Sequence, residues 1–191
     1  MPHVPRRILV AGTSGAGKTT LAHRVAHVLQ SPHIELDALF HGPGWTQRKT
    51  FATDVDRFSA EPTWVTEWQY DLVRPLLAER ADALIWLDLP RRTVMQRVIR
   101  RTLRRWLRRE VLWNGNIEPP LFTIFTDPDH IIRWSWRTHE ANAKSVMMIA
   151  RERGDLLIIR LRNQQEVERW LAGPLRAALD GQHQGSREIL T

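Results

Sequence analysis

The stretch that decides the fold is ILVAGTSGAGKTT, which occupies residues 8–20. Its second part, residues 12–19, fits the phosphate-loop pattern G-x-x-x-x-G-K-[ST]. An apolar run precedes this pattern and an amphipathic segment follows it, which is the strand–loop–helix context that the pattern requires. The stretch therefore predicts a P-loop that begins a parallel α/β fold and holds a nucleoside triphosphate.

Each position of the loop has a physical reason. Glycines let the backbone amides wrap around phosphates, and the following helix offers its positive N-terminal end. Lys18 is expected to reach the β- and γ-phosphates, while the Thr19 hydroxyl binds Mg²⁺. ATP and Mg²⁺ are the predicted cofactors. The predicted nucleotide-binding residues are Gly12, Ser14, Gly15, Ala16, Gly17, Lys18, Thr19 and Thr20.

The composition fits one soluble domain. The chain has 191 residues, of which 42% are hydrophobic, and it has no cysteine, so disulfides and thiolate metal sites are excluded. Without an apolar run of about 20 residues, we expect no membrane span and a cytoplasmic location. We predict a single domain over residues 1–180, a flexible tail over 181–191, and a monomer or homodimer.

Strand and helix patterns alternate along the chain, which is typical of a parallel sheet wrapped by helices. We predict a three-layer α/β P-loop NTPase fold, with a five-stranded parallel sheet and helices on both faces. The predicted strands are 6–12, 33–37, 63–68, 83–90 and 156–161. The predicted helices are 17–30, 47–59, 72–80, 91–109, 129–153 and 164–179.

Carboxylates end two of the predicted strands. Asp37 ends HIELD, with Glu35 two positions earlier, so both could face the phosphate site at the carboxyl edge of the sheet. There Asp37 could accept the proton of an attacking hydroxyl, although it could equally cap a helix or turn. Asp88 ends LIWLDLP and is a candidate Mg²⁺ ligand, or else a cap for the next helix.

The segment RRTVMQRVIRRTLRRWLRRE, residues 91–110, is rich in arginine. We predict an arginine-rich lid over residues 91–127 that closes on ATP, with Arg97, Arg101 and Arg105 stabilising the transferred phosphoryl group. A solvated basic helix is the simpler alternative. A third possibility is a nucleic-acid-associated P-loop ATPase that uses the basic helix 91–109 to contact phosphates.

A spaced set of segments resembles the adenylate-kinase-like P-loop proteins often labelled topology-modulation proteins. The set comprises GTSGAGKTT, LDALFHGPGWT, WVTEWQYD and ADALIWLDLPR, and the resemblance covers most of residues 7–140. It implies a fold like that of nucleoside monophosphate kinases. One departure stands after the third strand, where such proteins tend to show a D-G-N-Y-like stretch. This chain has Glu67, Trp68, Gln69 and Tyr70 there, so bulky Trp68 replaces the small glycine.

The leading interpretation is an ATP-dependent small-molecule kinase, because the motifs of signalling GTPases (D-x-x-G and N-K-x-D) are not found. Lys18, Asp37, Arg97, Arg101 and Arg105 are its predicted catalytic residues, and Thr19 and Asp88 its metal ligands. The acceptor could be a nucleotide, a nucleoside or another hydroxyl metabolite. The candidate acceptor-binding residues are Asp37, Trp45, Glu67, Trp68, Gln69, Tyr70, Asn116 and Glu118. The tryptophans among them could instead belong to the core.

Overall fold

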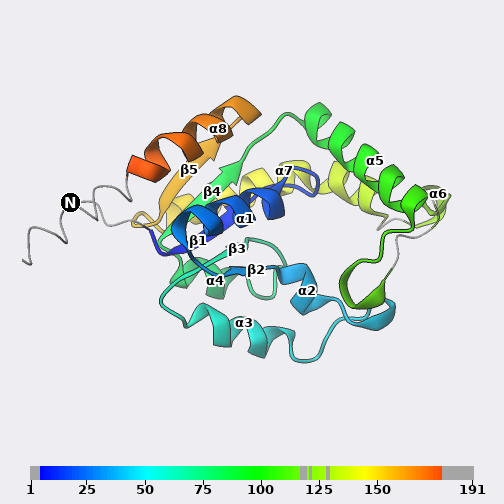
Figure 1. The fold of residues 1–191 in the computed structure, drawn as a ribbon, viewed down its shortest axis with the longest axis horizontal. Coiled ribbons are helices and arrows are strands. Elements are labelled where there is room, and N and C mark those ends of the chain that lie inside the picture. The colour runs from blue at the N-terminus through cyan, green and yellow to red at the C-terminus, as the bar shows by residue number, and fades with distance from the viewer. Residues whose placement is uncertain (1–4, 117–119, 121, 128–129, 178–191) are drawn as a thin grey trace, which may run out of the picture.

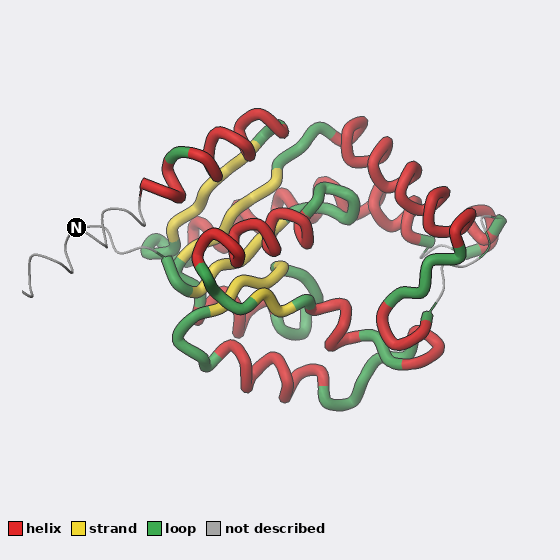
Figure 2. The backbone as a smooth tube through the Cα atoms, in the orientation of Figure 1, coloured by secondary structure: helices red, strands yellow, loops and turns green. Residues whose placement is uncertain are grey.

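The computed structural model describes residues 5–116, 120, 122–127 and 130–177 (Figures 1 and 2). Its strands are β1 (Arg7–Ala11), β2 (His33–Ile34), β3 (Trp64–Glu67), β4 (Ala83–Leu87) and β5 (Leu157–Leu161). Its α-helices are α1 (Lys18–Leu29), α2 (Leu36–Phe40), α3 (Phe51–Ser59), α4 (Arg74–Arg80), α5 (Arg91–Arg108), α6 (Thr123–Thr126), α7 (Ile131–Glu152) and α8 (Gln164–Ala172). Single 3₁₀ turns form η1 (Pro43–Trp45) and η2 (Trp113–Gly115).

The sheet has five parallel strands in the order β2-β3-β1-β4-β5. Strand β1 lies at the centre, where Ile8 pairs with Val65 of β3 on one side and with Ala83 of β4 on the other. The chain leaves β1 for the β2–β3 side and later crosses to β4. Ligands of open α/β sheets bind at the point where the strand order reverses in this way, beyond the carboxyl ends of the strands. The P-loop follows β1 at this position.

Helices cover both faces of the sheet, which confirms the predicted fold class (Figure 1). On one face, Val25 of α1 and Leu171 of α8 pack in a core with alternate residues of β1 and β4. On the other face, Phe51 of α3, Leu77 of α4 and Val146 of α7 pack in a second core. Strands β1 and β4 contribute to both cores because side chains alternate between the faces of a strand.

The second strand is the clearest correction to the sequence analysis. The residues of HIELD do not form one strand: β2 ends at Ile34, and Leu36 begins helix α2. Leu36 is fully buried, and the Ala38 amide donates to the Glu35 carbonyl oxygen at 3.2 Å as the chain turns. Burial of Leu36 by tertiary packing therefore overrides the extended pattern. The other predicted strands and helices lie where predicted, with shorter ends, whereas η1, η2 and α6 were not predicted. The predicted 181–191 tail lies outside the described residues.

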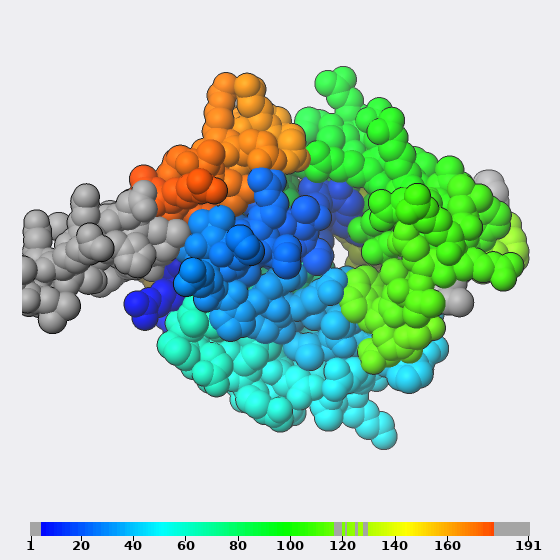
Figure 3. Space-filling view, viewed as in Figure 1, coloured from blue at the N-terminus to red at the C-terminus, as the bar shows by residue number. Residues whose placement is uncertain are grey.

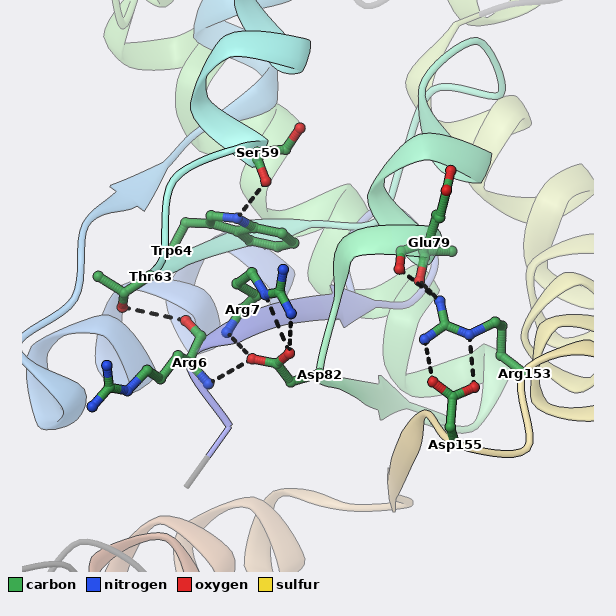
Figure 4. Close-up of polar contacts among 10 residues, drawn as sticks. Arg6, Arg7, Ser59, Thr63, Trp64, Glu79, Asp82, Arg153 and Asp155 are labelled. Carbon is green, nitrogen blue, oxygen red and sulfur yellow. Dashed lines mark hydrogen bonds and ion pairs between the residues drawn. The ribbon is translucent and has the colours of Figure 1, made fainter. Parts of the chain in front are cut away.

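The amino edge of the sheet is tied by structural ion pairs (Figure 4). Asp82 accepts hydrogen bonds from the Arg6 and Arg7 amides at 3.0 and 2.9 Å, and its other oxygen pairs with the Arg7 guanidinium at 2.7 Å. Arg153 pairs with Asp155 and donates to the Ala78 carbonyl oxygen at 2.6 Å. These contacts fasten the edge opposite the P-loop, so the carboxyl edge is the one available for ligands.

None of the helices in the described part of the chain has both the length and the apolar character needed to cross a bilayer.

Candidate active site

The P-loop joins β1 to α1 through glycines with positive φ. Gly12, Gly15 and Gly17 have φ of 152°, 88° and 100°, a region that L side chains rarely adopt. The Ala16 amide donates to the Thr13 carbonyl oxygen at 3.0 Å, and α1 begins directly after Gly17. The predicted nucleotide-binding residues therefore form one continuous loop at a helix N-terminus, the backbone arrangement that binds phosphates.

Helices α5 and α7 hold the outer side of this loop. Arg97 donates to the Ala16 carbonyl oxygen at 3.0 Å, and Arg101 donates to the Ser14 hydroxyl at 3.3 Å. From α7, the buried Ser135 hydroxyl donates to the Ser14 carbonyl oxygen at 2.8 Å. Arg97 also contacts Gln164 at 3.1 Å. Its guanidinium thus supports the loop backbone, whereas Arg101 reaches a side chain of the loop itself.

Lys18 faces two carboxylates. Burial lowers the pKa of Lys18 to about 8, and the negative charges of Asp37 and Glu67 oppose that shift. Arg101 lowers the pKa of Lys18 further by like-charge repulsion. Asp37 comes from α2 and Glu67 from β3, so the fold brings both of these predicted residues to the P-loop lysine.

Glu67 ends β3 and is 1% exposed. Its carboxylate accepts a hydrogen bond from the Thr19 hydroxyl, and its oxygens lie 3.3 Å from His33 Nε2 and 3.4 Å from the Leu36 amide nitrogen. Burial alone would raise the pKa of Glu67, but the hydrogen bonds from His33 and Thr19, with the His33 charge, hold it below its usual value. Glu67 is therefore a carboxylate kept ionised beside the P-loop threonine.

Asp88, the predicted metal ligand, has a different partner. Its Oδ2 accepts from Arg160 Nε at 2.8 Å and also from Arg160 Nη2. The Arg160 guanidinium stacks over Trp86, 4.6 Å from the ring centroid. Asp88 thus joins the ends of β4 and β5, and the carboxylate that the structure brings to Thr19 is Glu67.

Asp37 lies in the first turn of α2 and is held by residues that follow β3. Its Oδ1 accepts from Gln69 Nε2 at 2.6 Å and from the Tyr70 hydroxyl at 2.5 Å. Tyr70 stacks on Phe40 at 4.0 Å between ring centroids, and its hydroxyl lies 3.3 Å from His41 Nε2. Three predicted acceptor-site residues, Asp37, Gln69 and Tyr70, therefore form one hydrogen-bonded group.

Trp68 is a core residue rather than part of that group. Its side chain is 5% exposed, its indole donates to the Arg74 carbonyl oxygen at 3.1 Å, and the Arg74 guanidinium covers its ring. The bulky residue at this position faces the second core, which removes Trp68 from the candidate acceptor-binding set.

A bridge of polar and aromatic contacts joins η1 to η2. The Asn116 amide donates to the Gly42 carbonyl oxygen at 2.9 Å, and its oxygen accepts from the Trp45 amide at 3.1 Å. The His41 ring lies 5.0 Å from the Trp45 ring and 5.9 Å from the Trp113 ring. Asn116 is 5% exposed and fastens these loops to each other, whereas the sequence predicted that it contacts substrate. The predicted residue Glu118 lies outside the described residues.

Glu35 is tied to this bridge. It is the N-cap of α2 by position, and its carboxylate accepts a hydrogen bond from the Trp113 side chain. Burial raises the pKa of Glu35, with smaller contributions from the charges of Glu67 and Asp37, while the Trp113 hydrogen bond opposes the shift. Glu35, Asp37 and Glu67 are therefore close enough to influence one another.

These groups surround an opening in the molecular surface. Figure 3 shows it between the P-loop and α1 in blue, α2 in light blue, and α5 with the following loop in green. Helix α5 and η2, which fall in the segment predicted to be a lid, border this opening. Arg105 lies over the Trp113 ring, 5.8 Å from its centroid, and pairs with Glu110 at 3.7 Å. Arg100, Arg104 and Arg108 are exposed, as in a solvated basic face.

Comparisons with known proteins agree with this architecture. No protein-family model matches the chain, and no curated protein matches it significantly. A shikimate kinase from Acinetobacter baumannii in complex with shikimate matches with a TM-score of 0.50 and 18% identity, over 92% of this chain and 94% of that chain. A gluconokinase from Sinorhizobium meliloti 1021 matches with a TM-score of 0.47 and 18% identity, over 99% and 98%.

The chain has the fold of that shikimate kinase. The structural neighbours are small-molecule kinases with a P-loop fold, and at this identity the likeness concerns the fold alone. The finer resemblance to topology-modulation proteins stays a prediction.

His41 and Trp113 lie at the candidate site but were not predicted from the sequence. His41 is not spaced from other residues as metal ligands are. Trp113 precedes an Asn-Gly pair, and the sequence does not show that this turn packs against the loop around His41. The Asn-Gly pair itself was a usable signal, because such pairs form tight turns: Asn114 and Gly115 have φ of 55° and 81°.

Proposed function

We propose that this protein is an ATP-dependent small-molecule kinase that transfers the γ-phosphoryl group to a hydroxyl. One observation carries the proposal: Asp37 is held by Gln69 and Tyr70 while its charge acts on Lys18 of the P-loop. A carboxylate fixed beside the phosphate-binding lysine, on a different element from the P-loop, suits the activation of an acceptor.

The P-loop and α1 bind the donor in this proposal. Amides of the loop and the α1 N-terminus surround the phosphates, and the Lys18 ammonium neutralises the β- and γ-phosphate oxygens. Because Arg97 and Ser135 fix the loop backbone from behind, its amides are already oriented before ATP arrives. Arg97 is thus a positioning residue in this scheme.

Thr19 and Glu67 fit a magnesium ion. Mg²⁺ prefers hard oxygen ligands and is usually bound by one or two carboxylates together with substrate phosphates. A hydroxyl hydrogen-bonded to a buried, ionised carboxylate provides such oxygens at the phosphate end of the loop. When bound, the ion would neutralise charge on the phosphates. We therefore assign the metal-binding role to Thr19 and Glu67 in place of Asp88, which pairs with Arg160.

Asp37 has the role of proton acceptor. As the acceptor oxygen forms its bond to the γ-phosphorus, its proton passes to the Asp37 carboxylate, and the bond to the β-phosphate oxygen breaks to release ADP. Arg101, which already contacts Ser14, and Arg105 on the next turn of α5 are the arginines that act on this reaction in the proposed scheme. Their charges stabilise the phosphoryl group during transfer.

The substitution Asp37→Asn tests this assignment. The asparagine oxygen can still accept from Gln69 and Tyr70, so the fold is retained while the proton acceptor is lost. We expect phosphorylation of an acceptor to fall by about 10²–10⁴-fold, with ATP affinity nearly unchanged. Products are measured by mass spectrometry after incubation with Mg²⁺, ATP and a metabolite panel, and ATP affinity by calorimetry.

Glu61→Gln, at an exposed site after α3, is the control and should leave both measurements unchanged. Unchanged turnover of Asp37→Asn would refute the role of Asp37. Phosphate release without any phosphorylated acceptor would favour the ATPase alternative instead.

A further inference from the structure

The two sides of the opening carry opposite charges. On the donor side, Lys18 and Arg101 lie at the P-loop, where ATP needs positive charge. On the acceptor side, the carboxylates of Glu35 and Asp37 lie within electrostatic reach of each other. The acceptor side therefore presents negative charge to whatever binds beside the γ-phosphate.

The donors to these carboxylates are mostly uncharged. Glu35 accepts from the Trp113 indole, and Asp37 accepts from the Gln69 amide and the Tyr70 phenol. Hydrogen bonds from such groups orient a carboxylate without adding a positive charge that an anionic ligand could use.

The arginines of the same half are already paired with aspartates. Between residues 35 and 80, the pairs are Arg48–Asp54 at 3.4 Å, Arg57–Asp54 at 3.7 Å, Arg74–Asp71 at 2.9 Å and Arg80–Asp56 at 2.8 Å. Among these arginines, Arg74 is the one whose charge acts on Lys18. Its guanidinium also donates to Asn142 and covers the Trp68 ring. A phosphate or carboxylate on the acceptor would have to displace one of these partners in order to pair with an arginine of this half.

Aromatic rings and one polar atom complete the acceptor side. His41 packs against Trp45 and Trp113, and burial lowers the pKa of His41, which favours the neutral ring. Its Nδ1 is buried and has no hydrogen-bond partner among the residues that the structure describes. Flat rings, a neutral imidazole nitrogen and carboxylates are the groups that bind an uncharged ring bearing hydroxyls.

We propose that the phosphoryl acceptor is an uncharged, hydroxyl-bearing ring compound of the nucleoside or sugar type, not a nucleotide or a carboxylate-bearing metabolite. The inference rests on the proposed kinase function and narrows its acceptor. Glu35 and Asp37 select against anions by repulsion, and Asp37 also receives the proton of the acceptor hydroxyl.

Matched acceptors test this inference with the full chain, Mg²⁺ and ATP. Adenosine is compared with AMP, and glucose with glucuronate, so that the two members of each pair share the same rings and differ by one anionic group. We expect at least one uncharged member to be phosphorylated, with kcat/KM roughly tenfold or more above that of its anionic partner. The variant Glu35→Gln keeps an oxygen for Trp113 but removes a charge, so this ratio should fall severalfold. The control Glu61→Gln should not change it.

The possible results separate the two proposals. A higher kcat/KM for AMP or glucuronate than for its uncharged partner would overturn the inference while supporting a kinase. A ratio unaffected by Glu35→Gln would overturn the charge argument. ATP hydrolysis with no phosphorylated product from either pair or from the wider metabolite panel would overturn the proposed function, and the inference with it.

Discussion

Lys18 shows how one residue couples nucleotide binding to protonation. Burial lowers its pKa to about 8, so the free protein holds Lys18 partly neutral at and above that pH. ATP phosphates favour the charged form and must raise the pKa of Lys18, so ATP binding should take up as much as about one proton near and above pH 8. ATP affinity should therefore decrease as pH rises past about 8. Calorimetry in buffers of different ionisation enthalpy measures this uptake.

Lys144, on α7, provides the matched control for this proton. Lys144→Met should preserve the proton uptake at pH 8, whereas Lys18→Met should remove it and weaken ATP binding. Proton release on binding, or an ATP affinity that rises between pH 8 and 9, would show that the charge of Lys18 is not coupled to the phosphates.

At the scale of elements, the contact between the P-loop and α5 depends on Gly15. A Cβ at Gly15 would lie 2.7 Å from Val98 Cγ2 and 3.0 Å from the Val94 carbonyl oxygen, at a φ of 88°. Gly15→Ala should therefore lower the free energy of unfolding by about 1–3 kcal/mol and weaken ATP binding, because the loop must move away from α5. Denaturant unfolding and calorimetry measure both effects.

Gly44→Ala separates backbone strain from close approach. Gly44 has a φ of 65°, but a Cβ there meets nothing within 4 Å, so only strain of about 1 kcal/mol is expected. Val98→Ala combined with Gly15→Ala should recover part of the loss. If Gly15→Ala cost no more than Gly44→Ala, the packing of α5 against the loop would not be tight.

For the whole molecule, the η1–η2 bridge closes the side of the opening that lies away from the sheet. Asn116 joins the Gly42 carbonyl and the Trp45 amide across that gap. Asn116→Ala leaves these groups without their partner and should cost about 1–3 kcal/mol. Hydrogen exchange should speed up at residues 42–46 and 112–116, while the strands keep their protection.

Asn163→Ala is the matched control, since Asn163 caps α8, far along the chain from the bridge, by accepting from the Glu166 amide at 2.9 Å. It should speed up exchange in α8 and leave η1 and η2 unchanged. Equal exchange at η2 in wild-type protein and Asn116→Ala would mean that the bridge does not hold the lid to α2.

The sequence by itself determined the local part of this protein. The P-loop, its glycines, Lys18 and the helix after it follow from contiguous residues, and alternating apolar patterns predicted the layers and the parallel sheet. Asp37 was predicted to lie near the phosphate site, and its charge does act on Lys18, although Asp37 lies in a helix and not at a strand end. Residues 91–108 form the predicted basic helix because its pattern is long and regular.

Only the tertiary structure decided which residues from different elements meet. Glu67 and not Asp88 reaches Thr19, because α1 packs against β3 and the Asp88 carboxylate pairs with Arg160 of β5. Arg97 supports the P-loop, Asn116 fastens η1 to η2, and Trp68 faces the core. Local patterns report the face and the burial of a residue along its own element, whereas partners far apart in the chain are set by how the elements pack against one another.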